Sequence, residues 1–212
     1  MRTRIKFCGI TRVDDVNAGV AAGADALGFI LAAGSPRQLT MAQLDALLAS
    51  VPVFVTPVVL FRDHPADEVS AVLARSPRLV AQFHGDESPG FCASFERHWL
   101  KAVPMGALSD AALTPFLRAY ADAGCGGFVF DSHGGAVAGG SGRGFDWSRI
   151  PADLPAPLVL AGGLTPDTVA EAVRRVRPYA VDVSSGIESA PGIKDHAKMR
   201  GFADGVFRAR TD

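Results

Sequence analysis

Cys8 stands at the end of the first apolar run of the chain and is followed by Gly9-Ile10-Thr11. An ionised thiol is a nucleophile or a base, and a glycine behind it lets the backbone turn tightly and expose the side chain. A lone cysteine is more often a small buried apolar residue. The role of Cys8 therefore depends on what else the chain places near it.

A base at Cys8 needs help from neighbouring charge. A free thiol is only about 3% thiolate at neutral pH, so a nearby cation or dipole must raise that fraction. Lys6 lies two residues before Cys8 in the same apolar run. Since strand side chains alternate between faces, Lys6 is expected on the same side as Cys8 and is a candidate cause.

Asp131 ends another apolar run, Gly127-Phe128-Val129-Phe130-Asp131. Partial burial raises the pKa of a carboxyl group, which would let Asp131 hold a proton and act as a general acid. A cap of a loop or helix is the alternative interpretation. His84 follows the run Gln82-Phe83 and could orient a substrate, although structural histidines are more common.

Two segments of small residues predict a phosphate site. Ala161-Gly162-Gly163-Leu164 and Val183-Ser184-Ser185-Gly186-Ile187 would let backbone N–H groups approach an anion closely. Alternatively, the glycines only form turns and the serines cap a short helix. Arg37, in the rigid turn Ser35-Pro36-Arg37, offers a guanidinium suited to a carboxylate, unless it is a solvated surface arginine. The residues expected to contact a substrate are Arg37, His84, Gly162, Gly163, Asp182, Ser184, Ser185 and Gly186.

The elements that must position these residues repeat regularly along the chain. Short runs typical of strands alternate with helical patterns and helix-start signals. The expected strands are 4–8, 26–31, 53–61, 80–83, 99–103, 127–131, 158–161 and 180–183. The expected helices with recognisable ends are 12–23, 41–50, 65–76, 166–177 and 195–208.

Eight strand–helix units predict one (β/α)8 barrel that spans residues 1–212. The first turn lacks the glycine fingerprint of a dinucleotide-binding sheet. Because such barrels typically have about 250 residues, some helices must be short. Residues 132–157 are the least helical, and the glycine-rich loop 133–144 is expected to close over the site. In this fold Cys8, Asp131 and the phosphate segments share the carboxyl-terminal rim, where barrel enzymes place their chemistry.

Composition excludes several classes of protein. The net charge of −1 gives no basic surface for nucleic acid, and the three cysteines form no CxxC pair, which argues against a disulfide framework and a zinc site. The first apolar run is too short for a signal peptide or a membrane span. We therefore expect a cytoplasmic protein that binds a small ligand, without nucleic acid or membrane partners.

Taken in order, several segments resemble the phosphoribosylanthranilate isomerase family from residue 5 to about residue 200: KFCGIT, QFHGDE, LAGGLTPDTV, VRPYAVDVSSGIE and PGIKDHAKM. The resemblance implies a (β/α)8 barrel that catalyses an Amadori rearrangement of N-(5-phosphoribosyl)anthranilate in tryptophan biosynthesis, without metal or cofactor. It also implies that Cys8 is the general base and Asp131 the general acid. By the same resemblance Arg37 binds the anthranilate carboxylate, and the glycines and serines after strands 7 and 8 bind phosphate. A monomer and a homodimer both stay open.

Two other functions compete with this one. The first is a related barrel enzyme that acts on a different phosphorylated sugar. A histidine-pathway sugar isomerase would need a carboxylate at the end of strand 1, and indole-glycerol-phosphate synthase would need catalytic Lys and Glu on early strands. The second is a non-catalytic phosphate-binding barrel, which would be expected to lose Cys8 or Asp131.

Overall fold

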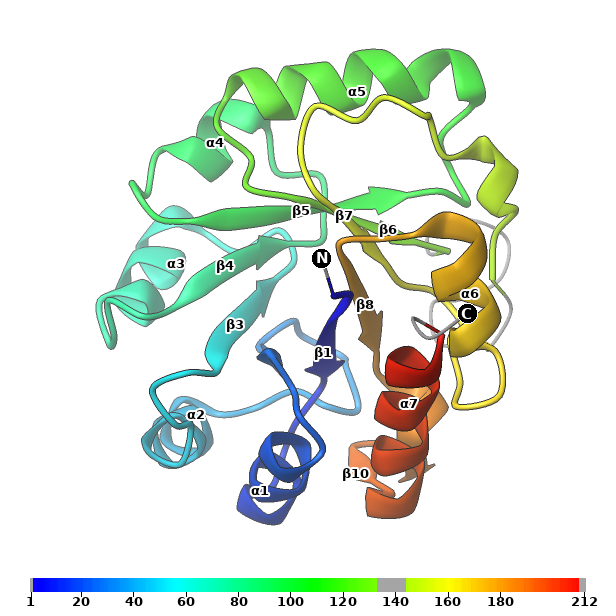
Figure 1. Ribbon diagram of the computed structural model, residues 1–212. Coiled ribbons are helices and arrows are strands. Elements are labelled where there is room, and N and C mark those ends of the chain that lie inside the picture. Colours follow the sequence, from blue (N-terminus) through cyan, green and yellow to red (C-terminus); the bar gives the residue numbers. More distant parts are fainter. Residues whose placement is uncertain (1, 133–143, 210–212) are drawn as a thin grey trace.

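The computed structural model describes residues 2–132 and 144–209. Eight parallel strands close into a barrel in sequence order, and the helices surround it, as Figure 1 shows. The predicted (β/α)8 fold is confirmed. The strands are β1 (Arg4–Cys8), β2 (Ala26–Ile30), β3 (Thr56–Phe61), β4 (Val80–Phe83), β5 (Trp99–Pro104), β6 (Phe128–Asp131), β7 (Leu158–Leu160) and β8 (Ala180–Val183).

The helices are short, as the chain length requires. Among the described residues between β6 and β7, the one helical element is a 3-10 turn, which agrees with the weak helical pattern there. The helices are α1 (Val13–Ala21), α2 (Met41–Ala49), α3 (Ala66–Leu73), α4 (Pro89–Ala93), α5 (Asp110–Asp122), α6 (Val169–Val176) and α7 (His196–Arg208), with 3-10 turns η1 (Trp147–Arg149) and η2 (Ser185–Ile187). A hairpin of β9 (Glu188–Ala190) and β10 (Ile193–Lys194) follows η2.

Pairing of β1 with β8 closes the barrel and sets which side chains face inward. Lys6 lies opposite Asp182 in this register. Phe7 points outward and packs edge-on against Phe202 of α7, with ring centroids 6.1 Å apart. Because side chains alternate along a strand, Lys6 and Cys8 point into the barrel.

The barrel interior combines apolar side chains with buried polar ones. Cys8, Ile30, Ala32 and Leu60 form one small apolar cluster. A second cluster comprises Leu100, Val129, Val159, Ala161 and Ala180. Lys6, Gln82 and Asp182 are buried as well. Since a buried charge must be paired, these polar residues constrain one another.

The structure corrects several predicted boundaries, among them the end of α3 at Leu73 instead of residue 76 and the starts of β3 and α6. Strand β3 begins at Thr56, not at residue 53, because Val55 donates a turn hydrogen bond to the carbonyl of Pro52. Val53 and Phe54 are therefore 78% and 98% exposed instead of buried in a strand. Helix α6 begins at Val169, three residues later than predicted, since a turn comes first: the Thr168 hydroxyl accepts from the Thr165 N–H.

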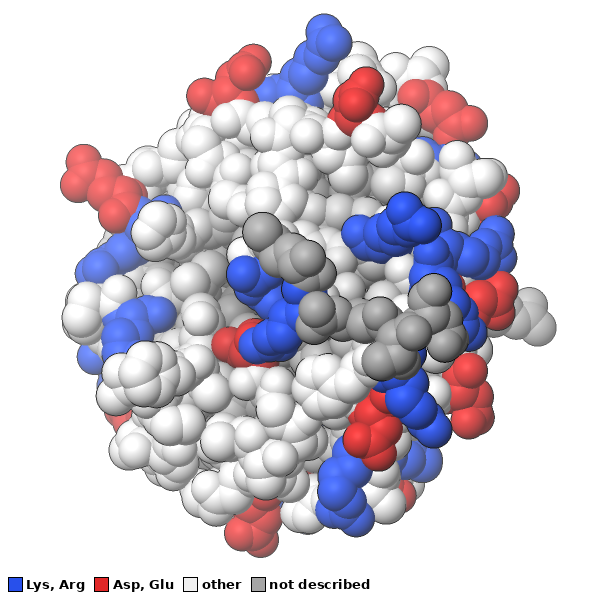
Figure 2. Space-filling model, in the orientation of Figure 1, with Lys and Arg blue, Asp and Glu red and all other residues white. Residues whose placement is uncertain are grey.

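Other features bear on the class of protein. Acidic and basic side chains are interspersed on the face shown in Figure 2, with wide uncharged areas between them. The three cysteines are free and buried. In the part of the chain that the structure describes, no helix has the length and apolar character to cross a membrane. Residues 133–143 of the predicted glycine-rich loop lie outside the described residues.

Candidate active site

Cys8 occupies the carboxyl-terminal end of β1 inside the barrel, where it is 6% exposed. The backbone turns directly behind it, since the N–H groups of Gly9 and Ile10 both donate to the carbonyl of Gly28 on β2. A Cβ atom added to Gly28 would lie 2.8 Å from the Cys8 sulfur. The absence of a side chain at Gly28 therefore makes room for the thiol.

A buried ion pair lies beside the thiol. Lys6 Nζ donates to Asp182 Oδ2 at 2.8 Å, and both side chains are at most 8% exposed. Burial raises the pKa of Cys8 above its ordinary value, although Lys6 acts in the opposite direction. Burial also raises the pKa of Asp182, against the effect of Lys6. The predicted position of Lys6 on the same side as Cys8 is confirmed, but Lys6 does not outweigh burial.

Asp131 ends β6 with its carboxyl group partly buried, at 22% exposure. Its Oδ2 lies 3.6 Å from Nε2 of His84, which follows β4. Nδ1 of the same imidazole lies 3.5 Å from the amide nitrogen of Gln82, whose Oε1 is buried without a partner among the described residues. The structure thus brings His84 and Asp131 together. The sequence around each residue did not predict this pairing.

Asp131 and Cys8 lie on different strands, and each interacts electrostatically with Asp182 of β8. The charge of Asp131 is among the causes that raise the pKa of Asp182, and Asp182 in turn raises the pKa of Cys8. In the closed strand order, β8 and β7 separate β1 from β6. The two predicted acid–base groups therefore belong to one electrostatic system.

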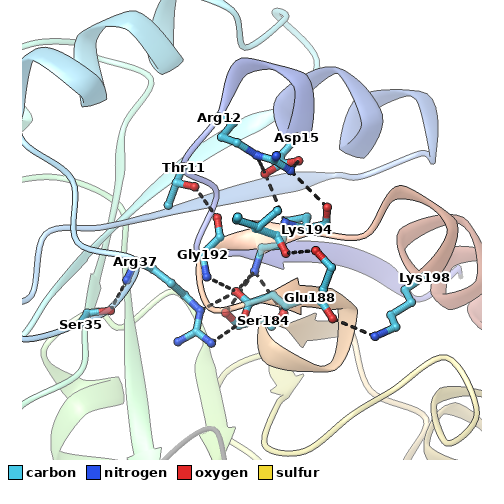
Figure 3. A network of polar contacts seen from close by, with 12 residues as sticks. Thr11, Arg12, Asp15, Ser35, Arg37, Ser184, Glu188, Gly192, Lys194 and Lys198 are labelled. Carbon is cyan, nitrogen blue, oxygen red and sulfur yellow. Dashed lines mark hydrogen bonds and ion pairs between the residues drawn. The ribbon is translucent and has the colours of Figure 1, made fainter.

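Arg37 is bound to a carboxylate of its own chain. Its Nε and Nη2 donate to the two oxygens of Glu188 at 2.7 Å each, and the Arg37 side chain is 16% exposed (Figure 3). The turn before Arg37 is fixed by a hydrogen bond from its N–H to the Ser35 hydroxyl. Arg37 is thus half-buried and ion-paired, and the interpretation as a solvated surface arginine is wrong.

Lys194 adds a second cation to this cluster. Its Nζ donates to Glu188 Oε1 at 2.8 Å and to the Ser184 carbonyl at 3.1 Å (Figure 3). Burial lowers the pKa of Lys194 more than Glu188 raises it. The pKa of Glu188 lies below its ordinary value, because Arg37 and Lys194 outweigh the effect of burial.

The β9–β10 hairpin that carries these residues is anchored to the start of α1. The fully buried Asp15 carboxylate accepts from Arg12 at 2.6 and 3.0 Å, and its Oδ1 lies 2.9 Å from His196 Nε2. Arg12 also donates to the Lys194 carbonyl, and the Thr11 hydroxyl donates to the carbonyl of Gly192. The first loop therefore fixes the hairpin in place.

The two predicted phosphate segments touch each other. Gly162 and Gly163 follow β7 with φ of 79° and 74°, a conformation that favours glycine. Among the described residues, the N–H groups of these two glycines meet no hydrogen-bond acceptor. A Cβ on Gly186 would lie 2.0 Å from the Leu164 carbonyl oxygen, so the loops after β7 and β8 are in direct contact.

The serines after β8 are not helix caps. Ser184 precedes η2 but makes no side-chain capping hydrogen bond. Instead its hydroxyl lies 3.4 Å from Lys194 Nζ. Ser185 and Gly186 belong to η2 itself, next to the Gly162-Gly163 loop. Small residues and open N–H groups thus meet where a phosphate would be held.

The sequence analysis missed Glu188, Lys194 and Asp15. The one available signal was that Glu188 and Lys194 flank the turn Pro191-Gly192, as a hairpin requires. It does not reveal that Arg37 is their partner. Within the described ranges, no three His, Cys, Asp or Glu side chains lie close enough to hold a metal ion.

A thiol and carboxylates lie toward the carboxyl-terminal ends of β1, β6 and β8 in a closed barrel, which is the arrangement of a (β/α)8-barrel enzyme. Residues 5–205 match the family model of N-(5'phosphoribosyl)anthranilate (PRA) isomerase. The chain belongs to this family and is an isomerase of tryptophan biosynthesis.

Individual relatives agree with this assignment. The chain is 52% identical over 212 residues to the N-(5'-phosphoribosyl)anthranilate isomerase of Chromohalobacter salexigens, a match that covers 99% of this chain and 97% of that protein. It is 51% identical over 203 residues to the isomerase of Thiobacillus denitrificans, covering 95% and 97%.

Solved structures give the same result. The phosphoribosyl anthranilate isomerase of Thermus thermophilus superposes with a TM-score of 0.82 at 33% identity, covering 98% of this chain and all of that one. A second isomerase structure, in complex with reduced 1-(o-carboxyphenylamino)-1-deoxyribulose 5-phosphate, superposes with a TM-score of 0.80 at 29% identity, covering 97% and 99%.

Proposed function

We propose that this chain rearranges N-(5-phosphoribosyl)anthranilate to 1-(2-carboxyphenylamino)-1-deoxyribulose 5-phosphate with Cys8 as general base and Asp131 as general acid. The observation that carries the proposal is the shared environment of the two groups. Cys8 ends β1 and Asp131 ends β6, and the buried Asp182 of β8 interacts electrostatically with each of them. No other thiol has this position, because Cys92 lies in α4 and Cys125 lies before β6.

The reaction requires one acid and one base. Asp131 gives its proton to the ring oxygen of the ribose as the C1′–O bond breaks, and the nitrogen lone pair forms a Schiff base. The Cys8 thiolate then takes the proton from C2′, and the electron pair of that C–H bond neutralises the iminium nitrogen. The resulting enolamine tautomerises to the ketone, so atoms and electrons balance without an added reactant.

Binding groups at both ends of the substrate would hold it over this pair. We assign the phosphate to Gly162, Gly163, Ser184, Ser185 and Gly186, supported by the open N–H groups of the first two. We assign the anthranilate carboxylate to Arg37 and contacts with the sugar to His84 and Asp182. Such positioning can lower the barrier by several kcal/mol, at about 7–11 in the best intramolecular cases.

The Asp182 assignment rests on an unused oxygen. Asp182 Oδ2 is taken by Lys6, but Oδ1 is buried without a hydrogen-bond donor in the described part of the chain. A buried carboxylate oxygen without a donor is costly. A sugar hydroxyl would satisfy it. His84 is assigned because it lies beside the Asp131 carboxyl group.

The proposal is tested with freshly prepared phosphoribosylanthranilate, following the loss of its anthranilate fluorescence. Cys8→Ser and Asp131→Asn are each expected to lower kcat by about 10²–10⁴-fold, the usual contribution of a general acid or base. Cys92→Ser, which changes a buried thiol outside the barrel interior, is the matched control and should keep near-wild-type kcat. Inactive wild-type protein would refute the substrate, and a near-normal rate in either variant would refute that residue's role.

The assembly, location and domain organisation are also proposals. We propose one domain over residues 1–212, supported by barrel strands that extend from Arg4 to Val183, in a cytoplasmic monomer or homodimer. One isomerase structure, from Thermotoga maritima, is described as monomers generated from a dimeric enzyme. Light scattering of the full chain separates the two assemblies, and a mass above that of a dimer would contradict both.

A further inference from the structure

Lys6 is a buried lysine that the proposed reaction does not use. It is 3% exposed and lies on β1, two residues before Cys8, so both side chains enter the barrel on the same side. Its ammonium group donates to Asp182 Oδ2 at 2.8 Å, and its charge lowers the pKa of the Cys8 thiol. One buried cation therefore pairs with the carboxylate of β8 and acts electrostatically on the thiol of β1.

The charged groups that face Cys8 come from four elements. Lys6 is on its own strand, Asp182 on β8, Lys194 on β10 and Arg37 in the loop after β2. Arg37 and Lys194 are engaged by Glu188, which accepts from both. Lys6 is the cation in this set with the largest effect on the pKa of the thiol.

Burial opposes any negative charge at Cys8. The pKa of the thiol lies above its ordinary value because desolvation outweighs the cations nearby. The pKa of Lys6 is raised as well, since Asp182 and Cys8 together outweigh its own burial, and Lys6 therefore stays charged. Without the ammonium group, a thiolate in this position would lose the largest of the cationic effects on Cys8.

We propose that Lys6 is a positioning residue that stabilises the thiolate form of Cys8, and that Asp182 limits this effect because it binds the same ammonium group. When the thiol loses its proton to solvent, the charge forms on the same inner side of β1 as a buried ammonium group that Asp182 already holds in place. The inference rests on the proposed function only for the role of the thiolate in the reaction. The titration of Cys8 is a property of the free protein.

Opposite effects of the two partners provide the test. The rate of Cys8 alkylation by iodoacetamide is measured against pH in the full chain, with the Cys8 peptide quantified by mass spectrometry so that Cys92 and Cys125 do not interfere. Lys6→Met is expected to move the midpoint upward by about one pH unit, a tenfold loss of thiolate at a given pH below it. Asp182→Asn is expected to move it downward.

Two further variants keep the result interpretable. Lys6→Met/Asp182→Asn removes both charges of the pair, so no unpaired buried charge remains, and its midpoint should lie above that of wild type but below that of Lys6→Met. Lys101→Met is the matched control, because Lys101 is an equally buried lysine paired with Glu87 at 2.9 Å, away from Cys8. Its midpoint should equal that of wild type.

The outcomes separate this inference from the proposed function. A double variant whose midpoint equals that of Asp182→Asn, with native circular dichroism, overturns the role of Lys6. A shift of Asp182→Asn in the same direction as Lys6→Met overturns the role of Asp182. Because alkylation needs no substrate, the expected shifts in a protein without isomerase activity would support the inference while refuting the proposed function. In an active protein, Lys6→Met should move the acid limb of the pH profile of kcat/KM to higher pH.

Discussion

The Glu188 carboxylate binds two cations. Removing its charge should lower the free energy of unfolding more than breaking an exposed ion pair does. Glu188→Gln keeps the shape but leaves Arg37 and Lys194 as neighbouring cations with little access to solvent. The Glu188 side chain is 6% exposed and accepts three charge-assisted hydrogen bonds from Arg37 and Lys194, at 2.7, 2.7 and 2.8 Å. Breaking one partner of a buried pair costs about 3–5 kcal/mol, because the remaining charge is uncompensated. We expect a loss in that range at neutral pH.

The pH dependence of this loss has a definite sign. The pKa of Glu188 is lower in the folded chain than in the unfolded chain, because Arg37 and Lys194 outweigh burial. Stability from such a group is complete above its unfolded pKa of about 4.3 and is lost as the pH falls through the folded pKa. The difference between wild type and Glu188→Gln should therefore be constant near neutrality and shrink below about pH 4.

Urea unfolding followed by far-ultraviolet circular dichroism measures this difference. The control is Glu171→Gln, which removes a pair with Arg175 whose side chains are both 61% exposed. Exposed helix pairs contribute only about 0.3–0.5 kcal/mol. A loss in Glu188→Gln no larger than in Glu171→Gln, or one that does not shrink in acid, would refute the reasoning.

Three other predictions follow from the site and its surroundings. Gly186→Ala would place a methyl group 2.0 Å from the Leu164 carbonyl oxygen, so the loops after β7 and β8 must separate. Inhibition by inorganic phosphate should then weaken by at least about tenfold, or 1.4 kcal/mol, and unchanged inhibition would contradict the phosphate assignment. Burial raises the pKa of Cys92 to about 12 and that of Cys125 to about 11, so neither should react with a thiol reagent near pH 8 until urea unfolds the chain, as peptide mass spectrometry would detect. Lys194→Met should raise the KM for phosphoribosylanthranilate more than it lowers kcat, since it removes positive charge beside Arg37; steady-state kinetics with an equal loss in both would contradict this.

Local patterns were sufficient to predict the barrel and the rim. Alternation along β1 placed Lys6 on the side of Cys8, and the structure agrees because neighbouring side chains in a strand must point to opposite faces. The pattern failed at residue 53, where Val53-Phe54 continue an apolar run but form a turn. Hydrophobicity alone does not distinguish a buried strand from an exposed apolar turn.

Partners distant in the chain could not be predicted from these patterns. Lys6 meets Asp182 across 176 residues because β1 pairs with β8 to close the barrel, and Arg37 meets Glu188 across 151 residues. Each partner is set by strand register and by the path of the hairpin after β8. A single sequence contains the charges, but it does not show which of them become neighbours.

The cluster of Arg37, Glu188 and Lys194 explains how one site can be both rigid and attractive to an anion. Glu188 fixes the guanidinium through Nε and Nη2, but it also cancels the charge of Arg37. Lys194 binds the same carboxylate and restores one positive charge to the group of three. Without Lys194 the cluster would be an internally neutral pair with little attraction for a substrate carboxylate. With it, an arginine held in one orientation retains a net charge that an anion can neutralise, which reconciles the own-chain ion pair with the proposed role of Arg37.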